Sequence, residues 1–198
     1  MISDIISTVL EAVIGNYLIS CFVLGLIVAV VEVLRWKGPR TASVISGLFL
    51  NEFILYALGV AFAINFVMHS VFGDYAAKTI GWAQSPFQLE LALASLGFAI
   101  IAFVVCGRRA QFRAKAAVVV AAFVSGLGDA AGHVYQMVVN DDYAVNNTGL
   151  LLIGDIVINV VGLALVVWHA VARRHDSRTG TDAAPPRTAA VDEAVPAR

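Results

Sequence analysis

The sequence predicts an all-α membrane protein, a bundle of five transmembrane helices with the N-terminus outside and the C-terminus inside. Its composition is 60% hydrophobic and only 14% charged, whereas soluble domains are typically about 45–50% apolar and about 25% charged. Residues 16–172 contain five long apolar stretches, and one spanning helix needs about 20 mostly apolar residues. The charges of the connecting loops alternate from one side to the other, which gives the orientation.

The helices are expected at five positions, and shorter segments flank them. The predicted spans are 17–36, 42–71, 86–106, 114–139 and 149–172. Residues 1–16 contain no Lys or Arg, so they do not resemble a secretory signal and are predicted to form a short amphipathic segment. Residues 173–198 are rich in Ala, Thr and Pro, with few large apolar side chains. Such a segment cannot offset its ordering entropy by burial, so we expect a disordered cytoplasmic tail.

Basic residues gather on one side of the predicted bundle. That side carries Arg35, Lys37, Arg40, Arg108, Arg109, Arg113, Lys115, Arg173 and Arg174. The opposite side carries Asp4, Glu11, Asp74, Lys78, Asp141 and Asp142. Because Lys and Arg concentrate in cytoplasmic loops, the basic side is expected inside, at the inner or plasma membrane of the cell. The net charge of −1 gives no reason to expect nucleic acid as a partner, so the lipid bilayer is the predicted one.

Ionisable groups inside the apolar stretches are the most informative feature for function. They are Glu52, Glu90, Asp129, His133 and Asp155. A carboxyl group at membrane depth costs several kcal/mol, roughly, and is usually kept for a role in the bundle interior. With Lys115 assigned to a loop, no Lys or Arg lies inside a span. The acids therefore have to hold protons or share a cation, which predicts a proton or cation site in the outer half of the bundle.

Helical spacing places these groups on shared faces. Asp129 and His133 are four residues apart, and so are Asp155 and Asn159, so each pair lies on one side of its helix. The alternative for Asp129 and His133 is a structural role, in which the two side chains only hydrogen-bond to each other. Glu52 is about 15 Å from the start of its span at 1.5 Å per residue. Other polar groups expected to line the site are Asn51, Tyr56, Gln136 and Asn159.

The start of the third span has a recognisable pattern. Ser85 fits an N-cap, Pro86 the first helical position, and Gln88 the residue that reaches back in a capping box. Trp82, just before it, is expected to anchor at the membrane interface. Glu90 lies deeper, where a capping role competes with a functional one.

Several chemistries fit these residues, and the sequence does not choose among them. Carboxylates with one imidazole suit a divalent metal such as Mn, Fe or Zn, although the Glu-x-x-His pair of di-iron bundles is absent. A haem between His69 and His133 is disfavoured by the nearby acids. Three hypotheses remain. The first is a protein that binds a proton or a cation, which in one version it also transports. The second is a membrane-embedded metalloenzyme, and the third is an accessory subunit whose polar groups only join helices. Few polar residues follow on the cytoplasmic side of Glu52, which favours a site open to the outside alone.

Two motifs carry a resemblance to a known family. They are GWxxSPFQxE at residues 81–90 and GDxxGHxxQ at residues 128–136. Together they resemble an uncharacterised family of small bacterial multi-pass membrane proteins, a domain of unknown function, over the region from the second to the fifth span. The resemblance implies a bacterial inner-membrane protein and brings no activity with it.

Overall fold

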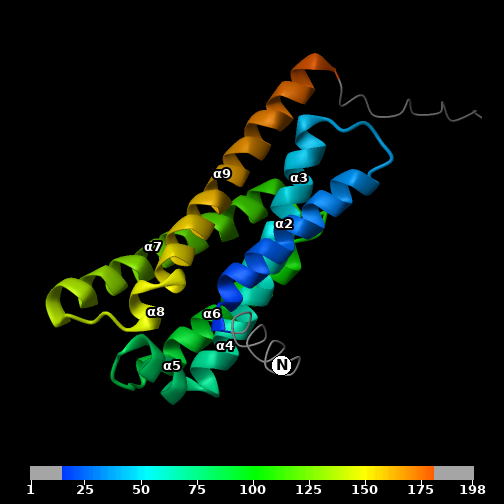
Figure 1. Cartoon of the computed structure of the whole chain (residues 1–198). Helices are drawn as coiled ribbons and strands as arrows, with labels where there is room; N and C mark the ends of the chain where they lie inside the picture. The colour runs from blue at the N-terminus through cyan, green and yellow to red at the C-terminus, as the bar shows by residue number, and fades with distance from the viewer. Residues whose placement is uncertain (1–14, 181–198) are drawn as a thin grey trace, which may run out of the picture.

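A computed structural model describes residues 15–180 of the chain, and all of its regular structure is helical (Figure 1). The all-α prediction is confirmed. The predicted amphipathic segment lies almost wholly outside the described residues, as does the tail from residue 181. The elements are α2 (Tyr17–Arg35), α3 (Ala42–Glu52), η1 (Phe53–Val60), α4 (Ala61–Ser70), α5 (Gly73–Ile80), α6 (Phe87–Val105), α7 (Phe112–Asn140), α8 (Val145–Thr148) and α9 (Leu150–Thr179).

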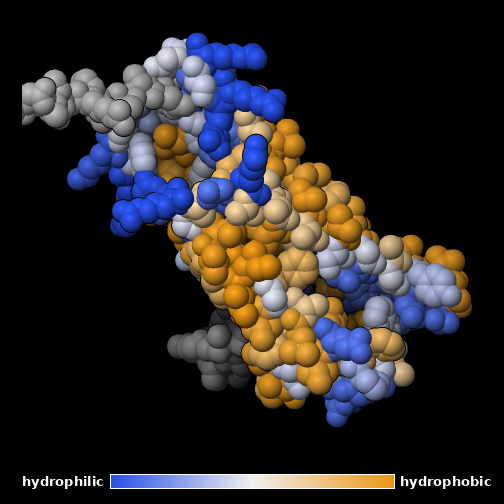
Figure 2. Space-filling view, turned by 180° about the vertical axis from the view of Figure 1, so that it is seen from behind, coloured by the Kyte–Doolittle hydropathy of each residue, from blue (hydrophilic) through white to orange (hydrophobic). Residues whose placement is uncertain are grey.

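Five helical segments within the described part of the chain are long and apolar enough to cross a membrane. They are Tyr17–Arg35, Ala42–Ser70, Phe87–Val105, Phe112–Asn140 and Val145–Thr179. Figure 2 shows a wide hydrophobic belt between two more hydrophilic ends. Large apolar side chains remain exposed along this belt, among them Leu34, Val104 and Val171. This is the surface expected of a membrane protein, whose outside faces lipid.

The helices pack in two pairs that separate toward one end of the molecule. α4 packs against α6, and α7 packs against α9, while α3 also lies along α9. In Figure 1 the two pairs lie together near the start of α7 and diverge toward α5 and α8. The main core fills the region where they are together and includes Leu50, Phe53, Ile54, Val119 and Val166. Where the pairs diverge, the packing leaves space.

The second span is not a uniform α-helix, as the apolar pattern had suggested. Residues Phe53–Val60 form a π-helical segment, η1, between α3 and α4. Such segments are rare and are often found at functional sites, because the wider turn changes the direction of the side chains that follow. Apolar periodicity alone does not reveal this change.

Two helix ends also differ from the sequence-based boundaries. α9 continues to Thr179, beyond the predicted end at residue 172. Asp176, in this extension, is buried and accepts a hydrogen bond from Ser43 N at 3.1 Å, so the first part of the predicted tail belongs to the fold. α6 begins at Phe87, and the residue before it, Pro86, gives no side-chain cap. The prediction that Ser85 caps this helix is therefore wrong.

Candidate functional site

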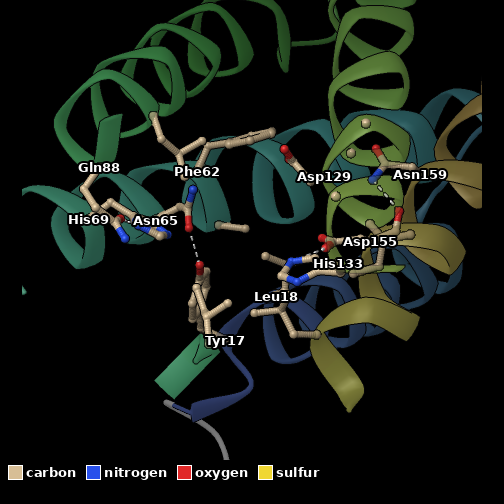
Figure 3. Close-up of a pocket in the computed structure, with 18 of the residues that line it drawn as sticks. Tyr17, Leu18, Phe62, Asn65, His69, Gln88, Asp129, His133, Asp155 and Asn159 are labelled. Atoms are coloured by element: carbon tan, nitrogen blue, oxygen red, sulfur yellow. Dashed lines mark hydrogen bonds and ion pairs between the residues drawn. The ribbon is translucent and has the colours of Figure 1, made fainter. Parts of the chain in front are cut away.

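A cavity of about 330 Å³ lies where the two helix pairs diverge. Figure 2 shows a hollow in this half of the surface, and Figure 3 shows side chains from opposite walls pointing into it. Its polar lining residues are Tyr17, Asn65, His69, Trp82, Ser85, Gln88, Asp129, His133, Asp155 and Asn159. These come from the ends of helices nearest the acidic loops. The volume is in the range of small-molecule pockets, roughly 300–1,000 Å³.

His133 is held in one orientation by a buried asparagine. Asn147, fully buried, donates its Nδ2 hydrogens to His133 O at 3.3 Å and to Asp142 O at 2.7 Å. Its Oδ1 therefore faces the imidazole ring, 2.7 Å from His133 Nδ1. A carboxamide oxygen can only accept, so Nδ1 carries the hydrogen. In the neutral ring the Nε2 atom is then an acceptor with a free lone pair.

That lone pair faces a buried carboxylate. Asp155 is 9% exposed, and its Oδ2 lies 3.8 Å from His133 Nε2 (Figure 3). This distance is too long for a direct hydrogen bond. Within the described residues, no group donates a hydrogen bond to the Asp155 carboxylate. Two acceptors that face each other at a largely buried position are unfavourable without a hydrogen-bond donor.

Two more residues of the predicted site lie on the same wall. Asp129, one turn before His133, points into the cavity and receives no hydrogen bond from the described part of the chain (Figure 3). Asn159 donates its Nδ2 hydrogen to Asp155 O at 2.7 Å. It packs so closely on Gly126 that a Cβ there would lie 2.0 Å from Asn159 Nδ2. Glycine at 126 is thus a requirement of this wall.

The opposite wall is built from a chain of hydrogen bonds that the sequence did not reveal. The Tyr17 hydroxyl donates to Asn65 Oδ1. Asn65 Nδ2 donates to Ser95 Oγ at 2.8 Å, and Ser95 Oγ donates to the Leu91 carbonyl at 2.9 Å. These donors are used within the wall. The chain links α2, α4 and α6, so it fixes the shape of the cavity on this side.

His69, at the end of α4, repeats the arrangement of His133. Its Nδ1 donates to Gln88 Oε1, so its Nε2 is also an acceptor when the ring is neutral. Gln88 therefore binds a neighbouring helix instead of reaching back over its own helix end, as the capping-box pattern had suggested. Sequence spacing gives no sign of this pairing, because the two residues come from different helices.

The two sequence motifs meet at this cavity. Trp82, from residues 81–90, lies with its ring centroid 5.3 Å from that of His133, in residues 128–136. Its Nε1 is buried, with no hydrogen-bond partner among the residues described. Trp82, half-buried in the loop before α6, therefore packs against α7, and its role as an interfacial anchor stays a prediction. Gly81, with φ of 90°, brings the loop so close to the connection between α7 and α8 that a Cβ would lie 2.5 Å from Asp142 Oδ1.

Comparison with known proteins adds a family. Residues 15–175 match the model of a family of unknown function, DUF6790. The chain belongs to this family. Neither the curated proteins nor the solved structures include a match. The expectation of an uncharacterised family is confirmed, and the cavity with its two motifs lies wholly within the part of the chain that DUF6790 covers.

Other predicted site residues of this DUF6790 chain lie elsewhere. Glu90 is exposed on α6 and does not line the cavity. Glu52 and Tyr56 lie beside α2, where a Cβ on Gly25 would be 3.0 Å from Glu52 O and 3.1 Å from Tyr56 Cβ. Gln136 accepts a hydrogen bond from Asn140 on its own helix. The five predicted ionisable groups therefore do not converge on one point: Asp129, His133 and Asp155 come together, and Glu90 and Glu52 stay apart.

Asn51 is engaged in the opposite half of the bundle. It accepts a hydrogen bond from Lys115, which is 6% exposed within α7. Lys115 is therefore not a loop residue, and the expectation that no basic side chain lies inside a span is wrong. Lys115 lies close to the start of its helix, so the sequence alone does not show whether it is a buried helical residue or an exposed loop residue.

The geometry also bears on the metal hypothesis. In residues 15–180, no group of three or more His, Cys, Asp or Glu side chains is arranged to hold a metal ion. Asn147 already engages one nitrogen of His133, and the ring faces a single carboxylate. This half of the DUF6790 bundle therefore contains a buried acid–imidazole pair beside a cavity.

Proposed function

We propose that this protein spans a membrane five times, with the N-terminus outside, and binds a proton between His133 and Asp155 in a cavity open to the outside. The observation that carries the proposal is the tautomer that Asn147 imposes, because it leaves His133 Nε2 as an acceptor toward a carboxylate. A proton on either atom removes the conflict. The low polarity of the surroundings makes the unprotonated pair costly.

Access from one side is supported by the contents of the other half. There the core residues Leu50, Phe53 and Val119 fill the space between helices. The polar groups in that half are paired, Lys115 with Asn51 and His169 with Ser46. The orientation is supported by the basic residues around the 106–111 loop.

The alternatives fit less well. A metalloenzyme needs more ligands than the described residues bring together. An accessory subunit whose polar groups only join helices should have every acid hydrogen-bonded and no space between them. Here Asp129 and Asp155 border a cavity and receive no hydrogen bond from the residues described.

The test uses Trp82 as a reporter, because its ring lies against His133. The chain has three tryptophans, so a Trp36→Phe, Trp168→Phe background leaves Trp82 alone. A charged imidazolium quenches indole fluorescence, and we expect a one-proton fluorescence transition with pH. In right-side-out membrane vesicles the transition should follow the external pH.

His133→Gln should abolish the transition, Asp155→Asn should change its midpoint, and His69→Gln should leave it in place. A transition that survives in His133→Gln would show that the proton binds elsewhere. A response to the internal pH alone would contradict the proposed orientation and access.

A further inference from the structure

The cavity offers mainly hydrogen-bond acceptors and negative charge. Its lining includes two carboxylates, Asp129 and Asp155, and neither Lys nor Arg occurs in it. The Nε2 atoms of His69 and His133 are acceptors in the neutral rings, since both Nδ1 hydrogens are engaged. On the opposite wall, the Tyr17 donor is engaged by Asn65. Trp82 Nε1 is a donor of this lining that has no partner among the described residues. The acceptors and the two carboxylates beside it favour a ligand that brings donors and positive charge.

The remaining lining is apolar and aromatic. Phe62, Phe87 and Trp82 contribute rings, and Leu18 and Ile158 contribute aliphatic surface. Aromatic faces attract a cation within about 6 Å of the ring, and the attraction grows as water is removed. An inorganic cation would leave most of this lining in contact with nothing, whereas an organic cation with an apolar body would cover it.

We infer that the cavity binds a small amphipathic amine, with its ammonium group between Asp129 and Asp155 and its apolar body against the aromatic lining. An ammonium has three donors and no acceptor, which complements this set of groups. Asp155 is nine-tenths buried, yet receives no hydrogen bond from the residues that the structure describes. A bound ammonium supplies the donor that this carboxylate lacks.

Binding of the amine is linked to the proton, and this step rests on the proposed function. At membrane depth the two acids are stable when two positive charges balance them. In the empty cavity both charges are protons, held on the carboxylates or on His133. When an ammonium enters, it replaces one of them, so one proton leaves for each amine bound.

The experiment compares three ligands that share a phenoxymethyl body and differ in the charge of the polar end group: 2-phenoxyethylamine, 2-phenoxyethanol and phenoxyacetate. Binding is measured by calorimetry on protein in nanodiscs, in buffers of different ionisation enthalpy, so that proton release is counted as well. We expect the amine to bind at least about tenfold more tightly than the alcohol, equivalent to about 1.4 kcal/mol, with release of about one proton. Phenoxyacetate should bind more weakly than either.

Matched variants locate the site. Asp129→Asn should weaken the amine at least about tenfold and leave the alcohol unchanged, since it removes charge and preserves shape. Glu90→Gln removes an exposed carboxylate outside the cavity and should change nothing. Equal affinity for the three ligands, or an amine affinity that Asp129→Asn leaves intact, would overturn the inference.

The two proposals can fail separately. If the pH transition of Trp82 is present and the amine does not bind, the ligand class is wrong and the proton site stands. If the amine binds through Asp129 without proton release and the transition is absent, the proton pair is wrong and the amine site stands.

Discussion

The two halves of this bundle each contain a histidine on a long helix, and the surroundings of the two rings differ. His133 lies beside Asp155 at 3.8 Å and borders a cavity. His169 lies 2.9 Å from the Ser46 hydroxyl and packs edge-on against Phe112, with ring centroids 5.4 Å apart. Each ring has its Nδ1 atom hydrogen-bonded, but His133 Nε2 faces a carboxylate beside a cavity, while the His169 ring packs against Phe112. A polar residue in a membrane helix is thus a sign of function when its partner is incomplete.

Glycines mark the same difference. In the closed half, Gly162 lets α9 approach Phe53, where a Cβ would lie 2.5 Å from the ring. On the cavity wall, a Cβ on Gly128 would meet nothing within 4 Å. Close packing by small residues, which is how membrane helices associate, is therefore confined to places where helices actually touch.

The largest expected effect is in the closed half. Asn51→Leu leaves the buried Lys115 ammonium without its acceptor, and we expect the free energy of unfolding to fall by about 3 kcal/mol. Unfolding in mixed detergent micelles measures this. The double variant Asn51→Leu, Lys115→Met should recover most of the loss, because both partners become apolar. A loss that persists in the double variant would mean that shape, and not the unpaired charge, is responsible.

The next effect separates packed from open glycines. Gly162→Ala forces Phe53 to move in the core, so we expect a loss of about 1–3 kcal/mol in the free energy of unfolding. Gly128→Ala meets no neighbour and gains helix propensity, up to about 1 kcal/mol. The same unfolding assay compares the two. Equal losses would contradict the presence of open space beside Gly128.

The smallest expected effects on stability come from removing a polar group near each of the two histidines. Ser46 is fully buried and donates to Ala42 O at 2.7 Å while it contacts His169. Ser46→Ala should cost about 1 kcal/mol of stability. Asp129→Asn should change stability by less than about 0.5 kcal/mol, as expected for a side chain without structural bonds. If Asp129→Asn destabilises more than Ser46→Ala, the carboxylate has a structural role.

Sequence reasoning reached the helical class and the central part of the site. The i, i+4 spacing of Asp129 and His133, and the acid in the last long helix, are local signals that the fold preserves. Tyr17, Asn65 and Asn147 were missed because their importance depends on contacts between helices. Asn147 gives no signal at all, since an asparagine in a short connection is ordinary.

The errors have related causes. Glu90 was grouped with the other acids by depth, but depth along a helix does not determine which way a side chain faces. The half predicted to be cytoplasmic looks poor in polar groups in the sequence, whereas Lys115 is buried and His169 half-buried there. Both have partners on α3, which is far away in the sequence.

The π-helical segment η1 determines which way the side chains of α4 point relative to those of α3. Each residue of an α-helix advances about 100° around the axis. If the same residues Phe53–Val60 were wound as a plain α-helix, α4 would turn by about that angle relative to α3, because the wider π-helical turns advance less per residue. Asn65 and His69 would then leave the cavity wall and Asn51 would keep its place beside Lys115. The wider winding of this short stretch therefore absorbs about one extra residue, and a homologue that is one residue shorter here and forms a plain α-helix should keep the same cavity lining.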